Sequence, residues 1–87
     1  MNKAIITFSN GVELIVSEGQ RFIPISKVVE KDEIYVSQSE SHEIWYHMHS
    51  ELIPSICDLL CKCDFFQLLE DSSIVYNSNS VVSIKNI

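Results

Sequence analysis

The sequence is poor in the residues that phosphate and nucleotide sites require. Its 87 residues include two glycines and one arginine, and six basic residues stand against twelve acidic ones. It contains no phosphate-binding loop, no glycine-rich dinucleotide fingerprint and no G-x-S-x-G motif. Its net charge of -6 disfavours nonspecific nucleic-acid binding. These absences exclude nucleotide-cofactor catalysis, and we expect no cofactor.

Long apolar runs are absent as well. No run approaches the roughly 18 residues of a membrane span, and the short apolar run 4–6 before Thr7 is too brief for a signal peptide. The three cysteines are odd in number and closely clustered, which is a poor disulfide framework. We therefore expect a cytoplasmic protein with no membrane partner and free thiols at Cys57, Cys61 and Cys63.

Enough hydrophobic residues are present, 46% of the chain, to form the core of a single domain over residues 1–87. Segments 4–8 and 12–16 alternate in polarity on either side of Asn10-Gly11. This pattern predicts a β-hairpin closed by a two-residue type I′ turn. A second turn is expected at 18–20.

Further strands are expected in the middle of the chain. Pro24 lacks a backbone donor, so its strand is expected at an edge or a bulge. The charged residues 30–33 predict a turn, and the polar segment 37–42 predicts a mobile loop. The three strands are expected at 22–25, 34–36 and 44–48.

One amphipathic helix is predicted over residues 51–63. Ser50 is the expected N-cap, so Ser50→Ala should cost about 1 kcal/mol, and Pro54 falls in the first turn. The apolar stripe holds Leu52, Ile53, Ile56, Leu59, Leu60 and Cys63, and the polar stripe holds Glu51, Ser55, Asp58 and Lys62.

The last third of the chain is expected to return to strands. Residues 65–69 favour a strand over a continued helix, and segments 74–76 and 81–84 predict a closing hairpin. The element order predicts an α+β fold. We expect an antiparallel sheet or a small SH3-like barrel of five to seven strands, covered by one helix.

Candidate binding residues are aromatic, imidazole and guanidinium side chains. In a strand over 44–48, Trp45 shares one face with His47 and His49, where it either anchors an interface or packs beneath the helix. The sole arginine, Arg21, lies beside a turn and can bind phosphate or carboxylate bidentately. Further candidate anchors are Tyr35 and Tyr46.

Two chemical hypotheses compete with simple binding. His42, His47 and His49 with the three cysteines could surround a zinc ion, although the spacing C-x3-C-x-C matches no compact zinc module. A cysteine nucleophile would need a base and an oxyanion hole, and no motif indicates either one. We therefore expect a protein that is not an enzyme and holds no metal.

Two segments, Ile6–Leu14 and Ile74–Ile84, resemble the first hairpin and the closing strands of bacterial Sm-like small barrels. The resemblance covers about a quarter of the chain and implies an SH3-like barrel. The Lys-His pair at that family's RNA-contacting turn is replaced by Asn77 and Ser78, which disfavours RNA binding. In composition the chain also resembles accessory proteins of phages and prophages of low-GC bacteria.

The function expected from the sequence is binding. We expect an inhibitor encoded by a phage or mobile element that binds a bacterial host protein, including those of defence systems, in the host cytoplasm. One alternative is a homo-oligomeric sponge for a small ligand or nucleotide signal, contacted by Arg21, Trp45 and His47. A small zinc-binding domain is the other alternative.

Overall fold

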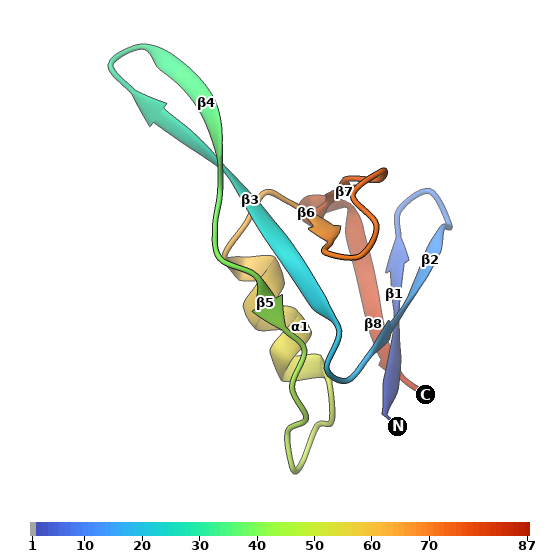
Figure 1. The fold of residues 1–87 in the computed structure, drawn as a ribbon. Coiled ribbons are helices and arrows are strands. Elements are labelled where there is room, and N and C mark those ends of the chain that lie inside the picture. The colour runs from blue at the N-terminus through green and yellow to red at the C-terminus, as the bar shows by residue number, and fades with distance from the viewer. Residues whose placement is uncertain (1) are drawn as a thin grey trace.

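The computed structural model describes residues 2–87 as an α+β fold with two antiparallel sheets and one α-helix (Figure 1), which confirms the predicted class. The first sheet has the order β2-β1-β8, and the second has the order β4-β3-β6-β7, with β5 also paired to β3. The elements are β1 (Lys3–Phe8), β2 (Glu13–Ser17), β3 (Arg21–Glu30), β4 (Glu33–Gln38), β5 (His42–Glu43), α1 (Ile53–Cys61), β6 (Phe65–Leu68), β7 (Tyr76–Asn77), the 3₁₀-helix η1 (Ser78–Ser80) and β8 (Val81–Asn86).

The hydrophobic core lies where the two sheets and the helix meet. Its aromatic centre is Phe66, whose ring packs edge-on against Phe22 at 5.8 Å and stacks on Tyr76 at 5.4 Å. The helix contributes its apolar stripe to this core, as the sequence predicts. The buried apolar residues of this cluster are Ala4, Ile6, Phe8, Val16, Phe22, Ile44, Leu52, Ile56, Leu59 and Phe66, and Ile25 of β3 is buried as well.

The first hairpin is confirmed, but its turn differs from the prediction. Gly11 has a φ of +86°, but Asn10 does not have a positive φ. The turn is therefore not type I′, which requires two such residues. The Gly11 N–H donates to the Phe8 carbonyl, and the Val12 N–H donates to Asn10 Oδ1. The loop therefore has three residues, with Gly11 as its left-handed residue.

The strand that contains Pro24 is interior rather than at an edge, which corrects the prediction. Strand β3 is ten residues long and is flanked by β4 and β6. Pairing with β4 ends at Ile25 opposite Gln38, and the Ser39 N–H donates to the Pro24 carbonyl. Pro24 thus lies at the point where β4 leaves β3, and there its missing donor interrupts no ladder.

The expected strand over 44–48 is absent, because only His42–Glu43 pair with β3 in this region. The Gly19 N–H donates to the Ile44 carbonyl, and the Trp45 N–H donates to Ser55 Oγ. The chain then reverses through a bridge between His47 and Glu51. These contacts hold 44–51 as an ordered loop rather than a strand.

The helix is shorter than predicted, and Ser50 is not its N-cap. Leu52 occupies the N-cap position without a side-chain cap, and Pro54 lies in the first turn as expected. Asn86 of β8 supplies the missing partners, because its Oδ1 accepts from the Leu52 N–H at 3.3 Å and its Nδ2 donates to the Ser50 carbonyl at 3.2 Å. Within residues 2–87, no helix is long and apolar enough to cross a membrane.

The expected closing hairpin is also wrong. Strand β7 pairs with β6, whereas β8 pairs with β1, so the two segments belong to different sheets. The intervening η1 turns the chain from one sheet to the other, and the predicted strand at 65–69 is confirmed as β6. The result is two small sheets rather than one continuous barrel.

Candidate functional site, a projecting β-arm

The outer parts of β3 and β4 form a two-stranded arm that extends away from the rest of the molecule (Figure 1). We define the arm as residues 25–38, whose register runs from Ile25 opposite Gln38 to Glu30 opposite Glu33. All six residues of β4 are exposed, and among residues 2–87 β4 pairs only with β3. Beyond Ile25, which is buried at its base, the arm is therefore ordered mainly by its backbone ladder.

One side of the arm is apolar. Val29 lies directly opposite Ile34, and Lys27 lies opposite Val36, so these four side chains project from the same side of the arm. Val29 and Ile34 are each 73% exposed, and Val36 is 60% exposed. We call Val29, Ile34 and Val36 the arm face.

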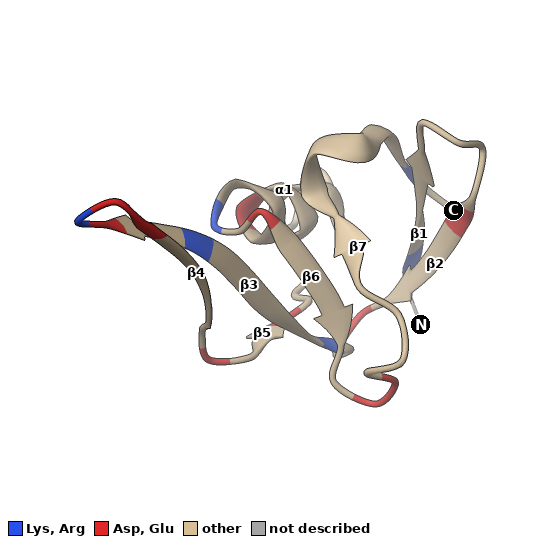
Figure 2. Cartoon of the chain, turned by 90° about the horizontal axis from the view of Figure 1, so that it is seen from above, with Lys and Arg blue, Asp and Glu red and all other residues tan. Residues whose placement is uncertain are grey.

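The tip of the arm is a tight charged turn. Lys31 and Asp32 have φ values of 47° and 70°, the two positive values that a type I′ turn requires. Glu30 and Glu33 flank them, so three acidic residues and one lysine gather at the tip (Figure 2). The turn predicted at 30–33 is thus confirmed, and the arm face ends beside an acidic tip.

The other side of the arm is more polar. Val28 lies opposite Tyr35, and the Tyr35 hydroxyl donates to Glu30 Oε2 at 3.0 Å. Ser26 lies opposite Ser37, and the Ser26 hydroxyl donates to the Lys62 carbonyl. The two sides therefore differ in chemistry.

The arm is fixed to the body at its base. The Lys27 N–H donates to Asp64 Oδ2 at 2.6 Å, and the Asp64 N–H donates to the Ile25 carbonyl at 3.0 Å. The Lys27 ammonium group also lies 5.6 Å from the centre of the Phe65 ring. These contacts link β3 to the segment between α1 and β6, so the base of the arm has a defined direction.

The predicted aromatic and histidine cluster forms, but on the loop between β5 and α1. The rings of Trp45 and His47 lie 6.1 Å apart, and those of His47 and His49 lie 6.0 Å apart. Trp45 and Tyr46 are exposed, with Trp45 at 39%, so the tryptophan does not pack beneath the helix. Figure 1 places this loop at the opposite end of the molecule from the arm tip. Tyr35 therefore does not join the cluster.

Arg21 is already engaged within the protein. Its guanidinium group contacts Glu43 Oε1 at 3.0 Å and donates to Ser41 Oγ at 3.0 Å. Glu43 is also its cross-strand partner in the pairing of β3 with β5. The guanidinium thus links β3 to β5.

A serine, a histidine and an aspartate meet between β5 and α1. His42 Nε2 lies 3.1 Å from Ser55 Oγ, and His42 Nδ1 lies 3.9 Å from Asp58 Oδ2. Ser55 is fully buried, which corrects its predicted place on the polar stripe, and its hydroxyl also accepts from the Trp45 N–H. A fully buried hydroxyl offers a substrate no access, so we assign the contact a structural role in tying the loop to the helix.

Burial between β5 and α1 shifts the pKa of His42. Desolvation lowers the pKa of His42 below 6.5, and the nearby Lys62 ammonium lowers it further, while Asp58 and Ser55 oppose the shift. Lys62 Nζ also lies 2.9 Å from Asp58 Oδ2, which confirms the predicted pair at i and i+4. His42 therefore favours its neutral form inside the fold.

The cysteines do not join the histidines. Cys57 and Cys61 are exposed on α1, whereas the half-buried Cys63 thiol donates to the Leu59 carbonyl at 3.1 Å, and burial raises its pKa. Over residues 2–87, no group of three or more His, Cys, Asp or Glu side chains is placed to hold a metal ion. The zinc alternative gains no support from these positions.

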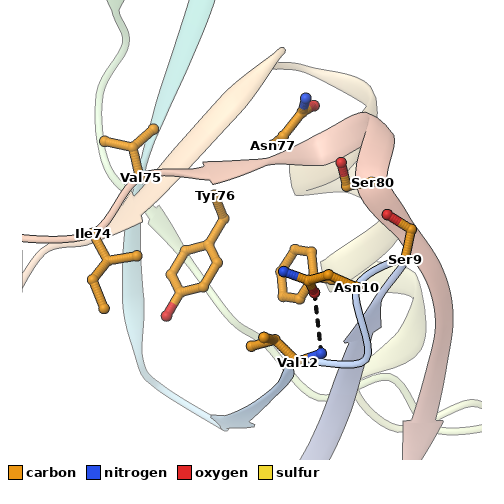
Figure 3. A pocket seen from close by; sticks show the side chains of 9 residues that line it. Ser9, Asn10, Val12, Ile74, Val75, Tyr76, Asn77 and Ser80 are labelled. Carbon is orange, nitrogen blue, oxygen red and sulfur yellow. Dashed lines mark hydrogen bonds between the residues drawn. The ribbon is translucent and has the colours of Figure 1, made fainter.

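A shallow pocket of about 330 Å³ opens between the first hairpin and the segment before β7. Figure 3 shows Val12, Ile74 and Tyr76 around it, with the Asn10 side chain turned toward the Val12 N–H. Its lining contains no charged side chain and none of the predicted site residues. The lining residues are Phe8, Ser9, Asn10, Val12, Ile74, Val75, Tyr76, Asn77 and Ser80.

Comparisons of the chain with protein-family models, with curated proteins and with solved structures find no significant match. Within the arm, only Tyr35 was predicted from the sequence as a binding residue. The available signal was the alternation of Ile34 and Val36 with more polar residues in 33–37, but the charge cluster at 30–33 masked it.

Proposed function

We propose that this protein is a non-enzymatic binding protein that docks on another protein through the arm face. The observation that carries the proposal is the exposure of Val29, Ile34 and Val36 together on one side of a projecting hairpin. Full burial of one such side chain contributes about 1.5–3 kcal/mol, so a partner that covers all three gains substantial free energy. Aligned apolar side chains on a sheet suit a groove or a sheet face on that partner.

The charges of the arm indicate the chemistry of the partner. The acidic tip favours basic groups at one end of the partner's apolar surface, and it adds orientation more than affinity. The further expectation that the partner is a bacterial host factor, and that binding inhibits it, belongs to this proposal and is supported by composition alone. The acidic surface as a whole, with a net charge of -6, disfavours nucleic-acid partners.

Capture from a bacterial lysate with matched variants tests this proposal. Val29→Thr with Ile34→Thr and Val36→Thr replaces the three side chains by a β-branched residue, which preserves strand propensity but removes apolar contact. The control is Val82→Thr on β8, which is 63% exposed and lies outside the arm. The wild type and the control should recover the same protein, and the triple variant should lose it. Equal recovery by all three would contradict the proposal.

The pocket supports a second candidate, the binding of a small neutral ligand. A volume of about 330 Å³ lies at the lower end for ligand sites, and the absence of charge in its lining disfavours nucleotides. Calorimetry against cyclic nucleotides and neutral aromatic compounds separates these ligand classes. A Val12→Trp variant should fill the pocket and abolish any heat of binding. Binding that survives this change would place the ligand elsewhere.

A further inference from the structure

The outer edge of β4 presents free backbone groups to solvent. On the other side of β3, the Lys27 N–H donates to Asp64, and beyond the end of β4 the Ser39 N–H donates to the Pro24 carbonyl. Backbone groups alternate in direction along an antiparallel pair. In β4, the N–H and C=O groups of Glu33, Tyr35 and Ser37 point toward β3. The N–H and C=O groups of Ile34, Val36 and Gln38 point away from β3, toward solvent.

This edge lacks most of the features with which proteins commonly protect exposed strands, and its one charged residue is Glu33 beside the turn. The sequence of β4 has no proline and no lysine, and its pairing with β3 is continuous, without a bulge. An unprotected edge six residues long is a template for another strand. A second copy of this chain can supply that strand, because its own β4 presents the same exposed edge.

We propose that two copies of this chain associate through antiparallel pairing of their β4 strands, with the two-fold axis at Tyr35. Because the axis is perpendicular to the sheet, both arm faces lie on the same side of the joined sheet. Because it passes through Tyr35, each residue pairs with the one whose number brings the sum to 70. Ile34 then lies opposite Val36 of the second copy, and Glu33 lies opposite Ser37 of the second copy. Outward-pointing backbone groups meet in this register.

The side chains favour this register over its neighbours. Apolar side chains oppose apolar ones, Tyr35 opposes its own copy, and each Glu33 carboxylate faces a Ser37 hydroxyl that can donate to it. An axis at Val36 would instead oppose Ile34 with Gln38. An axis at Glu33 would bring two carboxylates together, which is unfavourable.

Charge also favours the antiparallel arrangement. Each chain carries a net charge of -6, and three acidic residues lie at each arm tip. Antiparallel pairing puts the two tips, and the two bodies, at opposite ends of the assembly, whereas parallel pairing would bring the tips together. The pairing would also join the two arm faces into one patch that contains Val29, Ile34 and Val36 from both copies.

This inference concerns the edge of the arm and a second copy of the chain, whereas the proposed function concerns the arm face and a different protein. Either can fail while the other stands. Sedimentation equilibrium of the purified full chain, over a range of concentrations without any lysate, measures the association alone. The wild type should shift toward twice the mass of the chain as its concentration rises.

The variant Ser37→Glu tests the register. It introduces a carboxylate opposite Glu33 of the second copy at two symmetric places, so the dissociation constant should rise about tenfold. Adding Glu33→Lys to Ser37→Glu turns both contacts into ion pairs and should restore association. The control Ser72→Glu adds the same charge to an exposed residue outside the arm and should associate like the wild type, apart from general repulsion.

Hydrogen exchange followed for single amides provides the second readout. The amides of Ile34, Val36 and Gln38 should gain protection as concentration rises, while those of Tyr35 and Ser37 should be protected at every concentration by the ladder to β3. A chain that stays monomeric at millimolar concentration would overturn the inference. So would a dimer that Ser37→Glu leaves intact, because its interface would lie elsewhere.

Discussion

In the body of the molecule, Phe22, Ile56 and Phe66 are fully buried where two sheets and a helix meet, whereas every residue of β4 in the arm is exposed. The two regions are ordered by different interactions. Apolar burial stabilises the body, and a backbone ladder with a tight turn orders the arm. The side chains of the arm face therefore add little burial to the core and are available for contact with other molecules.

Phe66→Ala is expected to have the largest effect on the body. The ring contacts Phe22, Tyr76 and Phe8, with the Phe8 centroid at 6.4 Å. Its removal should cost about 3–5 kcal/mol in the free energy of unfolding, measured by urea denaturation. Ile34→Ala in the arm should change it by no more than about 0.5 kcal/mol. Similar losses from the two variants would show that the exposed arm side chains stabilise the fold as much as the core does.

Asn86→Ala tests the contact that caps the helix from β8. The variant removes both hydrogen bonds of the side-chain amide and leaves the N–H of the buried Leu52 without its partner. The loss should be about 1–2 kcal/mol in urea denaturation. Ser50→Ala is the matched control and should change stability by less than about 0.5 kcal/mol, because only the Ser50 carbonyl accepts these bonds. A larger loss of stability for Ser50→Ala than for Asn86→Ala would show that Ser50 is the cap.

The turn at the tip of the arm offers a way to stabilise the arm without changing the body. Lys31 and Asp32 both adopt positive φ, which is unfavourable for lysine. Replacing them by Lys31→Asn with Asp32→Gly should stabilise the arm by about 1 kcal/mol, since this pair suits a type I′ turn. Hydrogen exchange at Tyr35 should slow, while urea denaturation of the body stays unchanged. A matching rise in global stability would show that arm and body unfold together.

The pH dependence of stability should show the smallest effect. Because desolvation lowers the pKa of His42 in the fold, the unfolded chain binds a proton first as the pH falls. Stability from this group is complete above its ordinary pKa of 6.5 and declines as the pH falls below that value. Thermal unfolding between neutral and mildly acidic pH should show the decline, and His42→Gln should reduce it. The variant His49→Gln, which removes an exposed imidazole, is the control. An unchanged slope in His42→Gln would contradict the assignment.

Local patterns in the sequence predicted the local elements well. The first hairpin, the turns at 18–20 and 30–33, the amphipathic helix and the strand at 65–69 all follow from the spacing of apolar and turn residues. Tertiary contacts decided the remaining elements. Segment 44–48 alternates like a strand, yet its backbone bonds to Gly19 and Ser55 hold it as a loop. The N-cap failed for the same reason, since Asn86 lies 34 residues after Leu52.

The candidate site was harder to predict than the fold. Trp45, His47 and His49 do gather, but on a loop at the other end of the molecule from the arm. The arm itself was underestimated, because Pro24 and the charged segment 30–33 suggested a short strand that ends before Val28. No local pattern shows whether a β-branched residue faces the core or solvent. That depends on how far the hairpin extends beyond the sheet.

Site-specific photo-crosslinking is the most direct test of the claim that the arm face is the binding surface. A photoreactive phenylalanine derivative at position 34 should link the protein to one partner in a bacterial lysate. The same group at position 82, on the exposed surface of β8, should not link to that partner. Crosslinks from position 82 alone, or equal crosslinks from both positions, would contradict the account.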